Sequence, residues 1–530
     1  MGRFATSTGM ATVRGPGSAW IIADDFNLGN SGNGTLSVEA GAAVESASSN
    51  IGRFSTATGT ATVTGAGSTW TNSDDLVVGD EGSGTLNIET GGLVTVGFTT
   101  TIGTQGTINL TGGTLQFGSM SLTDLARING VSGTLRGTLE PITGFNSLSN
   151  LSLSNLAPAV SIDEVAMLNQ GVLFGSGLTG LRLTNDAAGE VEAITGERMR
   201  FTGSGNTNAG VINNFGGQIR FTQDLTNETG GVIQGRGQFI TSGGLTNAGQ
   251  MNFSGGFADV VGDVTLASTG TVTTSGGGVT TFFDDVHFDA GSLVTTTQGS
   301  QTVAFGQVTG TINTDGDGLW IIANGGTLLP GNSPGLGTFG GDLTISEAAA
   351  VEIELAGLMR GTEHDALDIL GALQLDGTLN VLLLDGFTPE AGSSFDIFNF
   401  GSLAGSFDAI NLPTLTNGLE WDTSSLYLDG TLTVVTSLIV GDFDGSGAVG
   451  QGDLNLVLLN WGSTASPAGF DASALSTGGP FDGNMSQNEL NDVLLNWGNT
   501  AEASGGSAVP EPATLALIAV GTPLLRRRRG

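Results

Sequence analysis

The chain has 530 residues, of which 90 are glycine and none is cysteine, and 50 acidic residues face only 15 basic ones, giving a formal net charge of −35. This charge repels phosphate backbones, so nucleic acid is a poor partner, and the lack of cysteine excludes disulfides and thiolate metal sites. A hydrophobic content of 38% is too high for a disordered chain.

The first hundred residues contain an internal repeat. Residues 2–44 recur at 52–94, an offset of 50, so that GRFATSTGMATVRGPGSAW is followed by GRFSTATGTATVTGAGSTW. Apolar and polar residues alternate within each copy and glycine-rich breaks follow, which is typical of short strands and turns. Because one strand set cannot bury its own apolar face, we expect successive sets to stack as a β-solenoid.

Two features of the repeat allow two interpretations each. Trp20 and Trp70 align, and they either pack in the core or offer a surface on which a sugar ring stacks. The pairs Asp24-Asp25 and Asp74-Asp75 either form carboxylate dyads or sit at turns, where aspartate accepts hydrogen bonds from its own backbone. We favour the core and turn interpretations.

The repeat resembles one shared by autotransporters (type V secreted proteins) and PEP-CTERM exported proteins. The segment TATVTGAGSTWTNSDDLVVGDEGSGTLNIETGGLV carries the resemblance, which covers residues 1–115. It implies a right-handed parallel β-helix. Met1 aligns with Ile51 inside a repeat, so we expect an incomplete N-terminus that lacks a signal peptide.

A shorter period follows in residues 116–325. Thr-Asn pairs begin at Thr184, Thr207, Thr226 and Thr246, with spacings of 23, 19 and 20 residues. About 20 residues suit one coil of three short strands, and aligned asparagines in such coils can form hydrogen-bonded ladders. Residues 326–437 are expected to form the last coils and a cap, because an open end would expose strand edges and core.

A β-helix could also be a polysaccharide-cleaving enzyme. Such an enzyme needs a base or paired carboxylates, and the chain has only two histidines, His287 and His364, each near acids. Neither has a second histidine or a lysine nearby in sequence. We therefore expect no catalytic site.

The most specific motif is D-F-D-G-S-G-A-V-G-Q-G-D at 442–453. A 12-residue EF-hand loop binds calcium through positions 1, 3, 5, 7, 9 and 12 and turns sharply at a glycine in position 6. Those positions predict calcium ligands at Asp442, Asp444, Ser446, the Ala448 carbonyl and Asp453, with Gly450 acting through water and Gly447 at the turn.

The segment after this loop is duplicated at an offset of 36, since DLNLVLLNWG recurs as ELNDVLLNWG from Glu489. The second loop is degenerate, because its first and third positions are Gly478 and Pro480. Asp482, the Asn484 carbonyl, Ser486 and Glu489 remain as weaker ligands.

Two loop–helix units within 438–500 resemble a type I dockerin, which implies a small all-α, EF-hand-like calcium module. Dockerins bind cohesins through loop positions 10 and 11. Here these are Gln451-Gly452 and Gln487-Asn488, without the usual hydroxyl pair, so the expected protein partner need not be a cohesin.

The C-terminal segment resembles the PEP-CTERM sorting signal. A linker at 501–508 precedes residues 509–530, which contain Pro510-Glu511-Pro512, an apolar stretch, and finally Arg526, Arg527, Arg528 and Arg529. Thirteen apolar residues are short for a stable membrane span, and the arginines favour a cytoplasmic end. The resemblance implies recognition and cleavage by an exosortase-type enzyme.

The sequence thus predicts an exported, cell-surface or extracellular-matrix protein with a structural or adhesive role, a calcium-stabilised interaction module and transient membrane contact through its tail. The alternatives are a β-helix that binds or degrades polysaccharide, and a scaffold that docks through residues 440–500.

Overall fold

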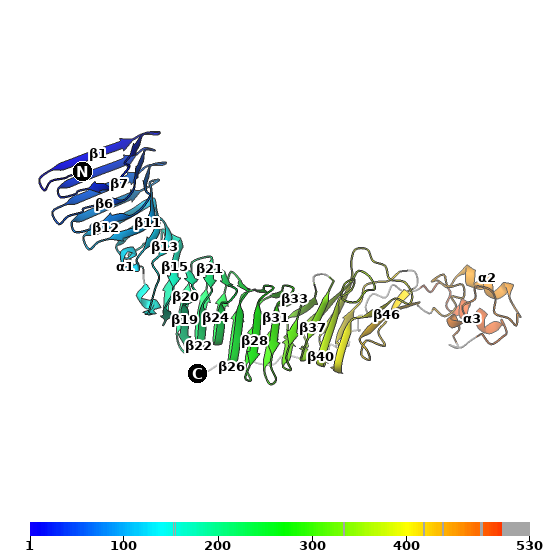
Figure 1. The fold of residues 1–530 in the computed structure, drawn as a ribbon. Coiled ribbons are helices and arrows are strands. Elements are labelled where there is room, and N and C mark those ends of the chain that lie inside the picture. Colours follow the sequence, from blue (N-terminus) through cyan, green and yellow to red (C-terminus); the bar gives the residue numbers. More distant parts are fainter. Residues whose placement is uncertain are drawn as a thin grey trace, which may run out of the picture. The chain divides into compact units, whose positions relative to one another are not determined.

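The fold was analysed in a computed structural model that describes residues 1–500 except 152, 154, 332–333, 417–418, 437–438 and 477–480. It is mainly β, with 53% strand and 6% helix, and forms a parallel β-solenoid of about 15 turns. Figure 1 shows the strands stacked coil upon coil. The predicted parallel solenoid is confirmed.

The chain divides into two compact units. One comprises Met1–Phe387, Ser394–Ala409 and Thr423–Leu432, and the other comprises Thr388–Ser393, Ile410–Asp422 and the residues from Thr433 on. The first contains the coils. The second contains a pair of antiparallel strands, β45 (Leu419–Asp422) and the end of β46 (Thr431–Thr436), and a small helical region.

One 50-residue sequence repeat corresponds to two coils. Strand β1 (Thr8–Arg14) pairs in parallel with β4 (Asn33–Glu39), which pairs with β7 (Thr58–Thr64), which pairs with β10 (Ser83–Glu89). Thr8 thus lies beside Asn33, and Asn33 beside Thr58, so each coil takes 25 residues. The inward residues Leu36, Ala61 and Leu86 stack in register and are fully buried.

The second residue of strands β4, β7 and β10 is a glycine, for a steric reason. Gly34, Gly59 and Gly84 are register partners. A Cβ added to Gly59 would lie 2.2 Å from the Leu28 carbonyl oxygen, and one added to Gly84 would lie 2.4 Å from the Ile51 carbonyl oxygen. Because any side chain would collide with the backbone, the G-T-L triplet of the repeat is a packing requirement.

The repeated tryptophan and aspartates have structural roles. Trp70 lies in β8 (Thr69–Asn72) between Val44 and Val94 and is fully buried, so the sugar-stacking interpretation is wrong for this residue. Asp75 lies at a corner between strands, where its Oδ1 accepts a hydrogen bond from the Thr99 amide of the next coil at 2.9 Å. Asp75 thus lies at a turn, as predicted, but the amide that it accepts from belongs to the neighbouring coil and not to its own turn.

The Thr-Asn pairs form the asparagine ladder that their spacing predicts. The asparagines end strands β18 (Arg182–Asn185), β21 (Asn206–Asn208), β23 (Leu225–Asn227) and β25 (Leu245–Asn247). Each side-chain amide donates to the amide oxygen of the next asparagine, at 2.6 to 2.8 Å, in the order Asn169, Asn185, Asn208, Asn227, Asn247. All five are buried, so the ladder satisfies polar groups inside the core.

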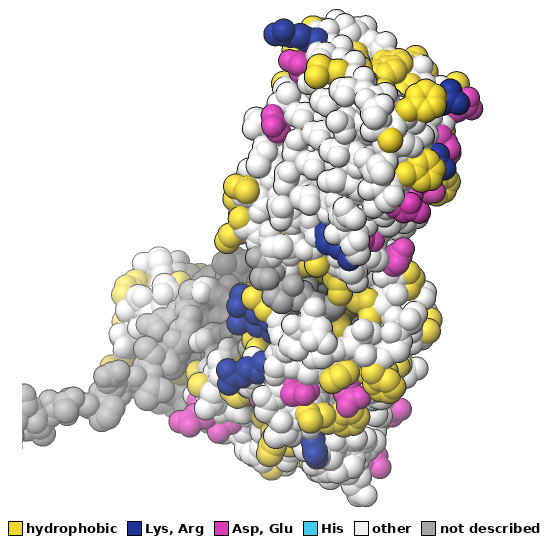
Figure 2. Space-filling view, turned by 90° about the vertical axis from the view of Figure 1, so that its left-hand side faces the viewer, with side chains coloured by type: hydrophobic (Ala, Val, Ile, Leu, Met, Phe, Trp, Pro, Cys, Tyr) yellow, Lys and Arg dark blue, Asp and Glu magenta, His cyan; other side chains and the backbone are white. Residues whose placement is uncertain are grey.

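The described helices are few and short. They are α1 (Leu122–Leu125), α2 (Gln451–Leu459) and α3 (Gln487–Leu495), with 3-10 turns η1 (Leu148–Leu151) and η2 (Ala472–Ala474). Among the described residues, no helix combines the length and the apolar composition that crossing a membrane would take. The face drawn in Figure 2 is largely uncharged, with a few acidic and basic side chains, some of which lie next to each other.

Interrupting the asparagine ladder should destabilise the solenoid. We expect Asn227→Ala to lower the free energy of unfolding by about 1–3 kcal/mol, because it leaves the Asn208 amide and the Asn247 oxygen without their ladder partner. Thr226→Ala is the matched control, since Thr226 is adjacent but faces away from the core. Denaturant unfolding measures both, and equal effects of the two substitutions would contradict a role for the ladder.

Candidate metal site in the duplicated module

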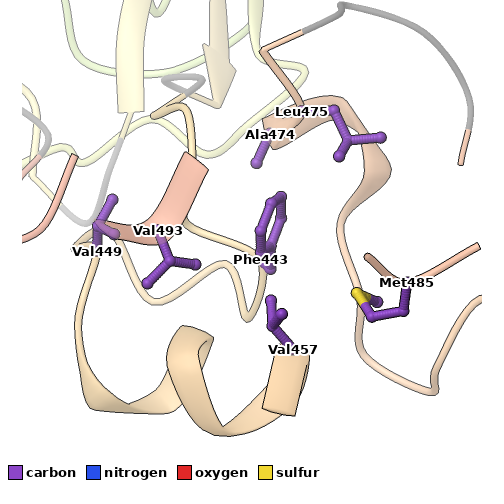
Figure 3. Close-up of a cluster of buried hydrophobic side chains, with 7 residues drawn as sticks. All are labelled: Phe443, Val449, Val457, Ala474, Leu475, Met485 and Val493. Carbon is purple, nitrogen blue, oxygen red and sulfur yellow. The ribbon is translucent and has the colours of Figure 1, made fainter. Parts of the chain in front are cut away.

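The C-terminal helices pack around a small apolar core. We call residues 439–500 the duplicated module. Figure 3 shows its buried side chains, which converge from the loops and from both helices. They are Phe443, Val449, Val457, Ala474, Leu475, Met485 and Val493. Val449 and Met485 are equivalent residues of the two halves, as are Val457 and Val493, so both copies contribute to one core.

The two halves also exchange backbone hydrogen bonds. Val449 donates to Asn499 at 2.8 Å and accepts from Gly498 at 2.9 Å. At an offset of 36, Met485 donates to Ser463 at 3.0 Å and accepts from Gly462 at 2.8 Å. Each loop is therefore tied to the residues that follow the other half's helix, and equivalent hydrogen bonds join the two halves in both directions.

The first loop brings three carboxylates together. One oxygen each from Asp442, Asp444 and Asp453 lies within 4.8 Å of the others. Asp442 and Asp453 are buried and Asp444 is exposed. Asp453 occupies the first turn of α2, where its two oxygens accept from the amides of Asp444 at 2.9 Å and Gly450 at 2.7 Å.

Two further oxygens belong to the same cluster. The Ser446 hydroxyl donates to the Ala448 carbonyl at 3.1 Å and lies 3.4 Å from Asp442 Oδ1. Asp442 also accepts from the amides of Ser446 at 3.0 Å and Gly447 at 2.8 Å. The loop therefore brings the three predicted carboxylates together, with the Ser446 hydroxyl beside Asp442 and the Ala448 carbonyl beside Ser446.

The residues fit a hard cation. Burial raises the pKa of the Asp442 carboxyl, the amides of Gly447 and Ser446 lower it, and the charges of Asp453 and Asp444 raise it further. No lysine, arginine or histidine of the described chain forms an ion pair with these carboxylates. A Cβ on Gly452 would lie 2.0 Å from Asp444 Oδ2, so a side chain at residue 452 would displace this carboxylate from its present position. Three carboxylates, a hydroxyl and a carbonyl match the oxygen ligands that calcium prefers.

The second loop has a different arrangement. Glu489 is buried and accepts from the Ser486 amide at 2.6 Å and from its hydroxyl at 3.0 Å. Asp482 is exposed and accepts from the Asn484 amide at 2.8 Å. Gly478 and Pro480 lie outside the described residues. Within the part described, no cluster of three acidic ligands forms here.

Sequence reasoning did not identify the apolar surface of this module. Both helices end in exposed leucine and tryptophan side chains that repeat at an offset of 36. Their exposed fractions range from 48% to 85%, and the residues are Leu458, Leu459, Trp461, Leu494, Leu495 and Trp497. We call these residues the Leu-Trp ridges. Contiguous exposed apolar groups on a small domain are typical of interaction surfaces.

The two histidines lie in separate coils. His287 is on β30 (Val286–Phe288), where Nδ1 lies 2.9 Å from the Thr309 hydroxyl and Nε2 lies 3.5 Å from Asp289. His364 is buried beside Phe395, and its Nδ1 lies 3.3 Å from the Gly357 carbonyl. Burial lowers the pKa of His364. The described pockets of about 510 and 240 Å³ lie elsewhere and are lined by neither histidine.

Asp365, next to His364, is a buried carboxylate that holds two chain segments. Its oxygens accept from the amides of Gly335 at 2.6 Å and Glu354 at 2.8 Å. Burial outweighs these bonds and raises the pKa of Asp365 to about 7. The group therefore keeps a proton in the folded chain at pH values where it would lose it in the unfolded chain.

The raised pKa of Asp365 predicts local stability that falls as pH rises. The contribution is complete below about pH 4 and is lost as pH rises through 7, so the region should open more easily at pH 8.5 than at pH 6, by about 1 kcal/mol. His364 acts in the opposite sense, because its lowered pKa costs stability as pH falls.

The comparison of wild type with Asp365→Asn separates the two groups. Hydrogen exchange at the Gly335 and Glu354 amides, corrected for intrinsic rates, should depend on pH more in the wild type than in the variant. The exposed Asp342, which accepts from the Ala372 amide at 2.7 Å, gives the control Asp342→Asn. An unchanged pH dependence in Asp365→Asn would contradict the assignment.

The sorting-signal residues Pro510, Glu511, Pro512 and Arg526–Arg529 lie outside the described residues, as does the linker at 501–508. No protein-family model matches the chain, and neither does any curated protein.

Proposed function

We propose that the chain is an exported structural or adhesive protein, in which a β-solenoid carries a calcium-stabilised, dockerin-like module that binds a protein partner. The observation that supports it most is the continuous stack of about 15 parallel turns, in which the inward residues fill a core. A stack of this kind is an extended scaffold rather than an enclosed cavity. The right-handed coil and the non-enzymatic role belong to this proposal.

Calcium would be held by the first loop. Asp442, Asp444 and Asp453 would supply carboxylate oxygens, Ser446 its hydroxyl and Ala448 its carbonyl. The bound ion would supply the positive charge that three adjacent carboxylates need. The Phe443 side chain, between the first two ligands, is fully buried in the module core, so ligand geometry and core packing are coupled. We propose weaker occupancy of the second loop by Asp482, Asn484, Ser486 and Glu489.

Removing a buried ligand should abolish tight binding at the first loop. We expect Asp442→Ala to weaken calcium binding by roughly 100-fold or more and to lower the melting temperature of the module, because folding and binding are linked. Calorimetric titration of the full chain measures the affinity, and tryptophan fluorescence with and without chelator follows the module through Trp461 and Trp497.

The control is Asp482→Ala, which removes an exposed acid of the second loop. It should leave the tighter binding event unchanged. Calcium affinity that is equal in wild type and Asp442→Ala would reject the first-loop site.

The Leu-Trp ridges support a protein partner. Leu459 and Leu495 are 85% and 84% exposed and occupy equivalent places at the ends of α2 and α3. No basic residue occurs in residues 439–500, which contain seven acids. A partner surface with an apolar groove and a basic rim would complement this composition.

The proposed function is tested by capture from the producing organism. The full chain, immobilised with calcium, should retain an envelope or matrix protein that chelator releases, and Leu459→Asp combined with Leu495→Asp should abolish retention. Asn455→Asp with Asn491→Asp is the charge control, since these exposed side chains gain the same charge one helical turn before the ridge leucines, without removing apolar surface. Retention that survives the ridge substitutions would contradict this partner site.

Export through a PEP-CTERM-type tail, exosortase-type processing and placement at the envelope or extracellular matrix rest on the sequence resemblance. A polysaccharide-binding or polysaccharide-degrading β-helix is the second candidate. Turnover of a glycan by the full chain, lost on His287→Ala or His364→Ala, would favour that alternative.

A further inference from the structure

An unusual pair of arginines faces outward from the middle coils. Arg200 lies on β20 (Arg198–Phe201) and Arg220 on β22 (Val211–Phe221), and they are direct register partners in neighbouring coils. Neighbouring strands are about 4.8 Å apart, so the two cationic side chains leave the sheet side by side. Like charges placed directly opposite each other destabilise a sheet.

Neither arginine is compensated by the described side chains. Arg200 and Arg220 form no ion pair within 4.0 Å, which they share with several other described arginines, but only these two are direct register partners of each other. Arg220 is half-buried, and its Nε is buried without a hydrogen-bond partner. In a chain of net charge −35, two adjacent guanidinium groups without a carboxylate partner can accept an anionic group from outside the chain.

An apolar pocket adjoins this pair. Its volume is about 510 Å³, and its lining includes Leu156, Pro158, Val160, Ile162, Leu178 and Arg200. Leu178, on β17 (Gly177–Thr179), is 57% exposed and is the register partner of Arg200 on the side away from Arg220. On the other side of the pair, the register partner of Arg220 is Ile240, on β24 (Val232–Thr241). In this row of register partners an apolar side chain therefore lies on each side of the two arginines.

Two ligand chemistries can be compared on these observations. A sugar ring binds best on an open aromatic face, but no aromatic side chain lines this pocket, whose apolar lining is aliphatic. The lining therefore suits an aliphatic chain better than a sugar ring. A ligand with an aliphatic chain in the pocket and an anionic group at its end would contact both the leucine-rich lining and the two arginine side chains.

We propose that Arg200, Arg220 and the adjoining pocket bind an amphipathic anion, namely a carboxylate or sulfate on an aliphatic chain. The anionic group would lie between the two guanidinium groups, which suit bidentate recognition of such oxygens. The aliphatic chain would cover Leu178 and the pocket lining. A volume of this size accommodates a medium-sized small molecule.

Binding of decanoate to the full chain tests the site. Titration calorimetry below the micellar concentration should detect one site, and Arg200→Gln with Arg220→Gln should weaken it at least tenfold. Leu178→Ser should weaken decanoate binding but not the weaker binding of inorganic sulfate. Arg14→Gln, which changes an ion-paired arginine of the first coils, is the matched control and should have no effect.

A second measurement does not depend on the choice of aliphatic chain. Sulfate, compared with chloride at equal ionic strength, should raise the melting temperature of the wild type more than that of the double variant. If folding of the double variant is impaired, the single variant Arg200→Gln, whose side chain is exposed, replaces it.

The proposal fails if decanoate binding is the same in wild type and double variant, or if decanol binds as tightly as decanoate. It also fails if sulfate binds as tightly as decanoate and Leu178→Ser has no effect, because the site would then be a simple anion site. Tight binding of alginate without binding of decanoate would overturn it in favour of a polymer.

Discussion

The structure depends on parallel pairing between successive coils. Each coil leaves its backbone donors and acceptors pointing along the solenoid, so that the neighbouring coils must satisfy them in register. Side chains then align by position: Leu36, Ala61 and Leu86 meet inside, and Arg200 meets Arg220 outside. Every ladder, whether it stabilises the core or creates a surface, follows from this constraint.

The sequence predicts those features that repetition makes visible. The 50-residue offset and the Thr-Asn spacing predict stacked parallel coils, and the regular Asn185, Asn208 and Asn227 predict a ladder. The D-x-D spacing from Asp442 predicts that the carboxylates converge, because an EF-hand loop has a fixed geometry. In each case the relevant residues are close in sequence or share one period.

Other features require the register between coils, which the sequence does not display. The two halves of the 50-residue repeat share only short stretches, such as Gly34-Thr35 and Gly59-Thr60, and the pairing of Thr8 with Asn33 establishes that each half is one coil. Arg200 and Arg220 are 20 residues apart in a region of irregular period, and their adjacency depends on where each coil turns. In the module, the pairing of Val449 with Asn499 joins the two halves, although the sequence shows only the duplication.

Because the first coils are equivalent, the number of coils in such a chain can change by duplication or loss of a repeat. Thr8, Asn33, Thr58 and Ser83 occupy one line, and the glycines beside the last three, Gly34, Gly59 and Gly84, leave no room for a side chain. Unequal recombination between the two gene segments that encode residues 2–44 and 52–94 would add or remove a pair of coils while every junction kept its native neighbours. The solenoid can therefore become longer or shorter by a pair of coils without needing a new interface between coils.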